Sequence, residues 1–527
     1  MGGGLLNLVS IGQENIILFG NPEKTFFNAT YKKITNFGMQ KFRIDYEGSR
    51  DLRMNTETKM EFKIPRYADL IYDTYIVLNL PDIWSPLYID SSENYIEYGF
   101  KWIENLGSNL IKDVEILAGG HPLAKYNGEY FSNLIQRDGS GVKKDLWNRM
   151  TGNIAELNDP ANAYSRVNTY PNAYNDGTTM NVRPSIYGRK LYIPIEAWFC
   201  RNVGCAFPLL SLQYQELSIS ITFRPIKELY IIRDVKDEEN NYPYIAPNIN
   251  EDYQQFYRFV NPPEDPSGNV TNNNEKWNTD IHLVSTYIFL DKIERVIFAK
   301  YPQNYLIRDV YIWEFFNVFG SRLIELDSKG LVSNYMLRFR RTDANQRNTW
   351  SNYTNWPYNT LPFDVDNTTS PDPNIYITGN YTNETELQNK KNILIDMAFL
   401  LDGKYRENTF DQGIYNYIEK YHNTSANAKD GLYIYSFSLH TDYKMYQPSG
   451  AINLDKFDKV QFEINTIEPP RNPNPDITSI CDPSGNIIGT RKNLYSLNDY
   501  NFDLMIFEER YNMVIFQNGM VGLKYAR

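Results

Sequence analysis

The 527-residue chain has little cysteine and little histidine, with three Cys and four His. Cys200, Cys205 and Cys481 are an odd, sparse set, which is not a disulfide framework and indicates free thiols in a reducing compartment. No histidine stands at a metal-ligand spacing from another His or from a Cys. We therefore expect no catalytic residue, no cofactor and no metal site.

Long apolar runs and excess positive charge are also missing. No stretch approaches the roughly 18 apolar residues of a membrane span. The start, "MGGGLLNLVS", lacks the basic and apolar regions of a signal peptide, so we expect no secretory route. The net charge of −11 argues against direct nucleic-acid binding, which needs a basic surface.

Motifs that carry chemistry are weak. The segment "GSGVKKD" (139–145) lacks the spacing of a phosphate loop, and we interpret it as a flexible loop. The pairs Glu508–Glu509 and Glu238–Glu239 are more typical of solvated faces than of acid–base pairs, because adjacency in sequence does not supply the geometry of a catalytic pair.

Asn-x-Ser/Thr sequons cluster in the second half of the chain. The candidate glycosylation sites there are Asn352, Asn367, Asn380, Asn383 and Asn423. A chain rich in Asn and Thr also forms sequons by chance. Without a signal peptide, chance is the favoured interpretation.

Tyrosine is abundant, with 42 Tyr against 8 Trp, and tyrosine favours strands and half-wet interfaces. β-Branched and aromatic runs separated by turn residues predict many strands. The predicted strands are 59–65, 74–81, 113–120, 189–195, 215–225, 285–290, 334–341, 392–400, 431–440, 459–464 and 511–523.

One short helix is expected in the middle of the chain, over "DKIERVIFAKY" (291–301), with Asp291 as its cap. It would divide the chain into two β-rich halves, each large enough for a jelly roll. Long polar stretches at 137–187, 226–280 and 342–391 are interpreted as loops. In "YQPSG" (446–450), Pro448 and Gly450 suit a type I turn, and Asn453 suits the start of a helical turn.

Several segments, in order along the chain, resemble the major capsid proteins of nucleocytoplasmic large DNA viruses, with mimivirus-like members most similar. They are "LFGNPEKTFFNATYKKITNFGMQ" (18–40), "FKIPRYADLI" (62–71), "LYIPIEAWFCRNVGCAFPLLSLQYQELSISITFRP" (191–225), "YIFLDKIERVIFAKYPQNYLIRDV" (287–310), "LRFRRTDANQRNTWSNYTNWPY" (337–358), "QPSG" with Asn453 and Asp458, and "YNMVIFQNGMVGLKYA" (511–526). Two departures are local: Gln215 stands where the family has His, and Leu454-Asp455-Lys456 replaces a more usual run.

The resemblance implies an all-β double jelly roll, two eight-stranded antiparallel sandwiches with long loop insertions and a short linking helix. The expected division is an N-terminal arm (1–24), a first jelly roll (25–290), a helical linker (291–303) and a second jelly roll (304–527). The polar stretches 342–391 and 401–430 would lie on the outer face.

The function implied is a structural major capsid protein without enzymatic activity. It would form a homotrimer with a pseudo-hexagonal outline, and such capsomers would tile an icosahedral shell. Its partners would be other copies of itself, minor capsid proteins and an inner viral membrane near the arm. It would be made in the host cytoplasm and end in the virion. The alternatives are a minor vertex capsid protein and a carbohydrate-binding β-sandwich.

Overall fold

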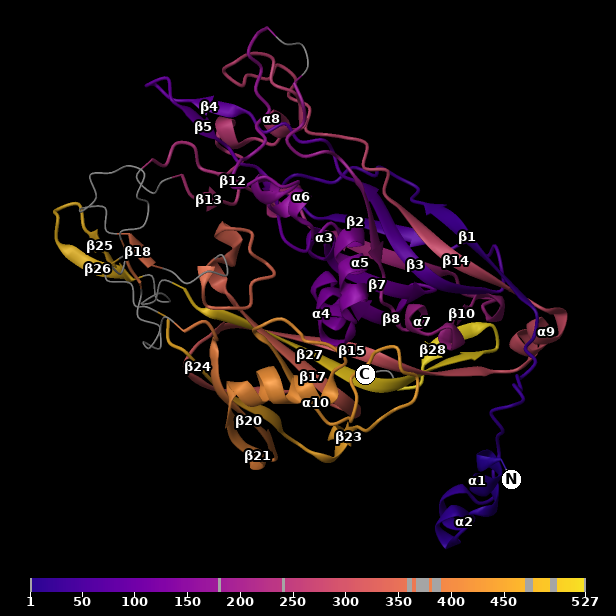
Figure 1. Ribbon diagram of the computed structural model, residues 1–527. Coiled ribbons are helices and arrows are strands. Elements are labelled where there is room, and N and C mark those ends of the chain that lie inside the picture. The colour runs from indigo at the N-terminus through magenta and orange to yellow at the C-terminus, as the bar shows by residue number, and fades with distance from the viewer. Residues whose placement is uncertain are drawn as a thin grey trace.

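The computed structural model describes residues 2–178, 182–238, 242–357, 363–365, 379–381, 390–469, 477–492 and 500–525. Two β-sandwiches lie side by side, and the N-terminal helices lie apart from both (Figure 1). Every predicted strand overlaps a strand of one of these two sandwiches. The predicted all-β double jelly roll is therefore the fold observed.

The first sandwich consists of two antiparallel sheets. One sheet has the order β1-β14-β3-β10, with β9 also paired to β3, and the other has the order β2-β11-β7-β8. The bounds are β1 Phe37–Asp45, β14 His282–Leu290, β3 Leu70–Asn79, β10 Phe207–Pro208, β9 Lys190–Pro194, β2 Thr58–Lys63, β11 Leu217–Phe223, β7 Ile111–Ala118 and β8 His121–Tyr126. The count exceeds the expected eight because β10 is a short addition of two residues.

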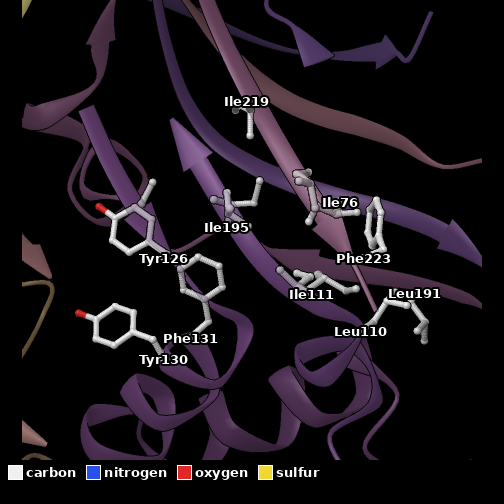
Figure 2. Close-up of a cluster of buried hydrophobic side chains, with 14 of the residues drawn as sticks. Ile76, Leu110, Ile111, Tyr126, Tyr130, Phe131, Leu191, Ile195, Ile219 and Phe223 are labelled. Carbon is white, nitrogen blue, oxygen red and sulfur yellow. The ribbon is translucent and has the colours of Figure 1, made fainter. Parts of the chain in front are cut away.

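Alternation of apolar side chains explains how these strands pair. On β2, Met60 and Phe62 are buried while their neighbours are exposed. Strand β11 pairs with β2 in the same sheet, and its Ile219 and Phe223 are buried. Figure 2 shows these β11 residues in one apolar layer with Phe131, which comes from a helix.

The second sandwich is built around two strands of 16 residues. Its sheets have the orders β15-β27-β17-β22, with β23 on β17 and β28 on β27, and β16-β24-β20-β21. The bounds are β15 Gln303–Val318, β27 Phe502–Gln517, β17 Leu331–Arg341, β22 Leu432–Ser436, β23 Ile452–Asn453, β28 Met520–Leu523, β16 Ser321–Leu326, β24 Val460–Thr466, β20 Leu394–Leu401 and β21 Lys404–Asp411. Rings of Tyr335, Phe399 and Phe462 fill its core.

Smaller sheets extend from the sandwiches. They are formed by β6 Lys101–Trp102, β12 Tyr230–Arg233 and β13 Tyr244–Ile245; by β4 Leu87–Ile89 and β5 Tyr95–Glu97; by β18 Phe363–Val365 and β19 Gly379–Tyr381; and by β25 Ile477–Cys481 and β26 Ile487–Lys492.

The α-helices among the described residues are short. They are α1 Gly3–Val9, α2 Gln13–Phe19, α3 Leu106–Leu110, α4 Gly128–Asp138, α5 Gly141–Thr151, α6 Ala155–Asn158, α7 Trp198–Arg201, α8 Tyr257–Val260, α9 Lys292–Lys300 and α10 Glu419–Asn423. The flexible loop expected at 139–145 is wrong, because Ser140 precedes α5 and Gly152 ends it with a φ of 80°.

The predicted central helix is present as α9, but Asp291 forms no side-chain cap. Tertiary contacts hold the helix instead. Arg295 Nη2 lies 3.0 Å from Asp69 Oδ2, and Ser211 Oγ donates to the Phe298 carbonyl at 3.0 Å. Long-range contacts therefore replace the expected local cap.

Residues 446–450 are not held by the predicted type I turn. No backbone hydrogen bond closes it; instead, Ser449 Oγ donates to the His440 carbonyl at 3.0 Å. Gly450 has a φ of 137°, and a β-carbon there would approach the Phe437 carbonyl oxygen at 2.9 Å. The helical turn after it is confirmed, since Asn453 Oδ1 accepts from the Asp455 amide at 3.1 Å.

The expectation that 342–391 stays exposed is wrong for the described residues near its start, while its place on the outer face stays a prediction. Asn348, Tyr353 and Asn355 are buried there. Asn348 Nδ2 donates to the carbonyls of Lys227 and Tyr230, both at 2.8 Å. Asparagine side chains thus satisfy backbone groups that would otherwise be buried unpaired. The 401–430 stretch contains β21 and α10, and its place on the outer face stays a prediction.

Candidate functional site

Helix α4 lies at the junction of the two sandwiches, between the first sandwich and strands β15, β17 and β27 (Figure 1). Asn127 begins the helix, since its Oδ1 accepts from the Tyr130 amide at 2.7 Å. All of its residues but Gln136 are buried. This helix was missed from the sequence although Tyr130, Phe131, Leu134 and Ile135 recur at helical spacing, because its many polar and charged residues are more typical of an exposed loop.

A charged group at the end of α4 reaches into the second sandwich. Arg137 lies 2.7 Å from Asp138 Oδ2 through Nη2 and 3.1 Å from Glu509 Oε1 through Nη1, and all three side chains are fully buried. Tyr130 donates to Glu509 Oε1 at 2.8 Å. We call this group, together with Arg308, the junction cluster; Arg308 Nη1 lies 3.5 Å from Glu509 Oε2.

The electrostatics of the junction cluster favour ionised groups. Burial alone raises the pKa of Glu509, but the guanidiniums of Arg137, Arg308 and Arg201 outweigh it and hold this pKa at about 2. Asn334 Nδ2 adds a hydrogen bond to Glu509 Oε2 at 2.9 Å. The carboxylate is therefore charged at neutral pH and links α4 to β27.

A second ionic group joins the same helix to strand β17. Glu129 Oε2 lies 2.8 Å from Arg338 Nη2, and Glu129 Oε1 lies 2.6 Å from Arg340 Nη1. Burial opposes ionisation of Glu129, but Arg338, Arg340 and Arg224 hold its pKa well below the ordinary range. Both ends of α4 thus carry a carboxylate or guanidinium paired across the junction.

The solvated face expected for Glu508–Glu509 is wrong, because both residues are completely buried. They lie on strand β27, where successive side chains point to opposite faces. Glu508 accepts from Trp313 Nε1 at 2.9 Å and pairs with Arg510, whereas Glu509 meets α4. The partners of Glu509 come from sequence positions too distant to be inferred by pattern. The other pair, Glu238–Glu239, extends beyond the described residues.

Apolar contacts cross the junction as well. The Phe207 and Phe516 rings lie 5.0 Å apart, the Tyr130 and Phe507 rings 5.7 Å apart. One continuous buried cluster contains residues of both sandwiches. The two sandwiches are therefore fixed relative to each other by both packing and ion pairs.

The N-terminal segment presents the opposite situation, an apolar surface without cover. No residue of α1 or α2 is buried. The exposed fractions of its Leu, Val, Ile and Phe side chains run from 51% at Leu5 to 82% at Ile17. Contiguous exposed apolar surface of this kind marks an interaction site. No helix of the described residues is both long and apolar enough to cross a membrane.

One carboxyl in the junction, that of Asp309, lies in surroundings that disfavour its ionised form. Asp309 on β15 is 5% exposed, and burial raises its pKa from 3.8 to about 6. Above pH 6 the folded state holds a costly ionised group, whereas below about pH 4 the cost is absent. We expect Asp309→Asn to raise the free energy of unfolding by about 2 kcal/mol at pH 8, with the gain fading as the pH falls through 6 toward 4.

Chemical denaturation at several pH values measures the Asp309 effect. Asp145→Asn is the matched control, because the Asp145 side chain is 59% exposed. A gain at Asp309 that did not depend on pH would contradict the electrostatic explanation.

Among the described side chains, Cys200 and Cys205 are free and buried, and burial raises the pKa of both thiols, that of Cys205 to about 11. We expect both to react slowly with a thiol reagent in the native protein, because the thiolate is scarce. Denatured protein that has not been reduced should show three thiols that react with the reagent. Fewer than three would indicate a disulfide. The Cys481 side chain lies outside the described residues.

Two of the candidate glycosylation sites, Asn352 and Asn423, have side chains that the structure describes. Asn352 is 8% exposed, and its Nδ2, the atom that a glycan would occupy, donates to the Trp356 carbonyl at 2.7 Å. Asn423 Nδ2 donates to Glu419 Oε2 at 2.6 Å. Asn380 lies in β19, while its side chain and Asn367 and Asn383 lie outside the described residues. Glycosylation at these sites stays a prediction.

The described residues contain no group of three or more His, Cys, Asp or Glu suited to a metal ion. Gln215, the departure from the family pattern, has a clear role: its Oε1 accepts from the Val521 amide at 2.7 Å, and so joins the first sandwich to the C-terminal hairpin. The geometry overall is that of a joined pair of sandwiches with an uncovered arm.

Comparisons with known proteins match this geometry. The chain is 24% identical over 533 residues to the major capsid protein of Paramecium bursaria Chlorella virus 1, covering 100% of both chains. It is 24% identical over 544 residues to "Probable capsid protein 4" of Acanthamoeba polyphaga mimivirus, covering 91% of this chain and 94% of that protein. With the major capsid protein of Phaeocystis pouchetii virus it shares 28% identity over 313 residues, 59% of this chain and 53% of that protein.

Solved structures agree in fold. The PBCV-1 virus capsid structure superposes with a TM-score of 0.62 at 19% identity, covering 95% of this chain and 100% of that chain. The Faustovirus major capsid protein gives a TM-score of 0.62 at 14% identity, covering 94% of this chain and 93% of that chain.

Two family models divide the chain between them. "Major capsid protein N-terminus" matches residues 25–291, and "Large eukaryotic DNA virus major capsid protein" matches residues 294–522. The chain therefore belongs to the major capsid protein family of large eukaryotic DNA viruses, and it is a structural component of the virion capsid.

Proposed function

We propose that this capsid subunit assembles as a homotrimer with six similar lobes. The observation that carries the proposal is the junction between the sandwiches. Because the Arg137–Glu509 pair and the Phe207–Phe516 contact fix the two lobes of one chain, three chains can present a defined pseudo-hexagonal outline. Such capsomers can tile the flat faces of an icosahedral shell.

Edge strands of the two sandwiches also favour assembly with other chains. Strands β8 and β21 each end the order of their sheets, and β21 is exposed along nearly its whole length. An exposed edge offers unpaired backbone groups to another chain. A closed trimer, and then contacts between capsomers, would cover such edges.

The N-terminal arm is proposed to lie at the inner base of the capsomer, next to the viral membrane. Its exposed apolar residues favour a partner of low polarity. Thr35, eleven residues after the arm, donates to Glu294 Oε1 of α9 at 2.7 Å. The inner location itself comes from the family resemblance. Minor capsid proteins would be further partners at this base.

We propose the division into arm (1–24), first jelly roll (25–290), linker (291–303) and second jelly roll (304–527). Helix α9 between β14 and β15 supports the linker. The role is proposed to be structural, without catalysis and without direct contact to nucleic acid. Synthesis in the host cytoplasm would precede incorporation into the shell.

Light scattering on the purified full chain tests the trimer. Three chains of 61.7 kDa predict a particle of about 185 kDa at micromolar concentration. A monomer or a dimer there would contradict the proposal. A minor vertex protein would be found in few copies per virion, and a carbohydrate-binding protein would act as a monomer, so virion stoichiometry separates these alternatives.

A further inference from the structure

A small cavity of about 40 Å³ lies where α7 of the first sandwich meets β15 of the second. Its lining is unusual in charge: it includes Arg201, Arg308 and Lys444 but no Asp or Glu. The full lining is Trp198, Arg201, Asn202, Cys205, Leu306, Ile307, Arg308, Tyr443, Lys444, Met445, Tyr446 and Tyr511. A site lined by cationic donors without carboxylates is suited to an anion.

Arg201 has hydrogen-bonding capacity left over. The residue is 7% exposed; its Nε donates to the Glu196 carbonyl at 3.0 Å and its Nη2 to Tyr130 Oη at 3.2 Å. Its Nη1 has no hydrogen-bond partner among the described residues, and the same holds for Trp198 Nε1 on the same helix. Both atoms are donors, so only an acceptor can satisfy them.

The charges around the cavity do not balance locally. Arg137 and Arg308 share Glu509, and Arg137 also pairs with Asp138. No carboxylate of the described residues lies within 4.0 Å of the Arg201 guanidinium. Glu509 acts on Arg201 only from beyond that distance and is already paired with Arg137 and Arg308, so Arg201 has no close counter-ion of its own.

Two further acids lie in the surroundings, Glu196 and Asp309. Neither carboxylate lies within ion-pair distance of the Arg201 guanidinium, so both act on it only from farther away. They therefore compensate Arg201 only in part.

We propose that this cavity binds one small inorganic anion of the halide class, held between Arg201 and Arg308. The cavity volume of about 40 Å³ is enough for a monatomic ion, since a cavity volume of about 10–15 Å³ already holds one water molecule. Exposed Lys444, Met445 and Tyr446 form the solvent side of the lining, so the ion can enter from the surface. The ion would add a contact between α7 and β15, and hence between the sandwiches. The site does not depend on the trimer proposal.

Thermal unfolding of the full chain in sodium chloride or sodium gluconate, at equal sodium concentration, tests the site in solution. Gluconate is too large for the cavity, so chloride is expected to raise the melting temperature by about 2 °C. Arg149→Gln should keep the rise, because the Arg149 side chain is 69% exposed and pairs only with the exposed Asp145 among the described residues. Arg201→Gln should abolish it.

Lys444→Gln covers the case in which Arg201→Gln does not fold, since Lys444 is exposed. This variant should fold normally and show a smaller rise than the parent. An equal chloride response in the parent, Arg201→Gln and Lys444→Gln would overturn the proposal, because the response would then be a general salt effect.

Crystals of the unmodified chain grown in bromide give an independent readout. Anomalous scattering should place a bromide ion within hydrogen-bond distance of both Arg201 and Arg308. A water molecule in the cavity without an anomalous peak would overturn the proposal, as would bromide found only beside exposed lysines.

Discussion

Glu509→Gln is expected to lower the free energy of unfolding by about 3–5 kcal/mol, because it leaves the buried guanidiniums of Arg137 and Arg308 without their shared carboxylate. Denaturation by guanidinium chloride at pH 7 measures the loss. Glu57→Gln is the matched control: Glu57 pairs with Lys112, both side chains are more than two-fifths exposed, and such pairs contribute at most about 1 kcal/mol.

The same variant has a pH signature. The folded-state pKa of Glu509, about 2, lies below its ordinary value of 4.5, so its contribution is complete above pH 4.5 and is lost as the pH falls toward 2. The difference in stability between parent and Glu509→Gln should therefore shrink over that window. A difference of less than about 1 kcal/mol at pH 7 would mean that the junction cluster does not hold the sandwiches together.

Deleting residues 2–17 is expected to remove most assembled particles while leaving the melting temperature of the subunit unchanged. No residue of α1 or α2 is buried, so the deletion removes no core contact. Covering a Leu or Ile side chain contributes roughly 1.5–3 kcal/mol, and the arm carries several, so its loss removes a large part of the attraction to a partner. Particle yield by sedimentation and electron microscopy measures the effect.

A full-length control separates loss of apolar surface from loss of chain. Leu6→Ser combined with Leu8→Ser should reproduce the deletion, whereas Asn7→Ser, on the same helix, should leave particle yield unchanged. Normal yield from the deleted chain would show that the arm has no part in assembly.

The strands could be predicted from sequence because their signal is local. On β11, Leu217, Ile219, Ile221 and Phe223 alternate with small polar residues, and all four are buried. The pattern needs no knowledge of the partner strand, since one buried face already imposes a period of two. Helix α9 was found for a similar reason, although its anchoring to Asp69 was not.

The junction could not be predicted from the sequence because its ion pairs join residues that are far apart in the chain. Arg137 and Glu509 are 372 positions apart, and neither has a neighbour in sequence that marks it as buried. Charged residues are mostly exposed, so the general rule favoured the wrong interpretation for Glu509. Gln215 is similar: its bond to Val521 becomes visible only when the C-terminal hairpin is in position.

The span between Arg137 and Glu509 has a consequence for biosynthesis. A ribosome adding about 5–20 residues per second needs about 20–75 seconds to make the 372 positions between them. The last strand of the first sandwich ends at Leu290, so this sandwich can form well before β27 is made, and α4 then still lacks the strand that neutralises and covers it. The nascent subunit therefore exposes a charged and aromatic face until its last strands emerge, and it is in this interval that chaperones, or premature contacts between unfinished chains, would decide its fate.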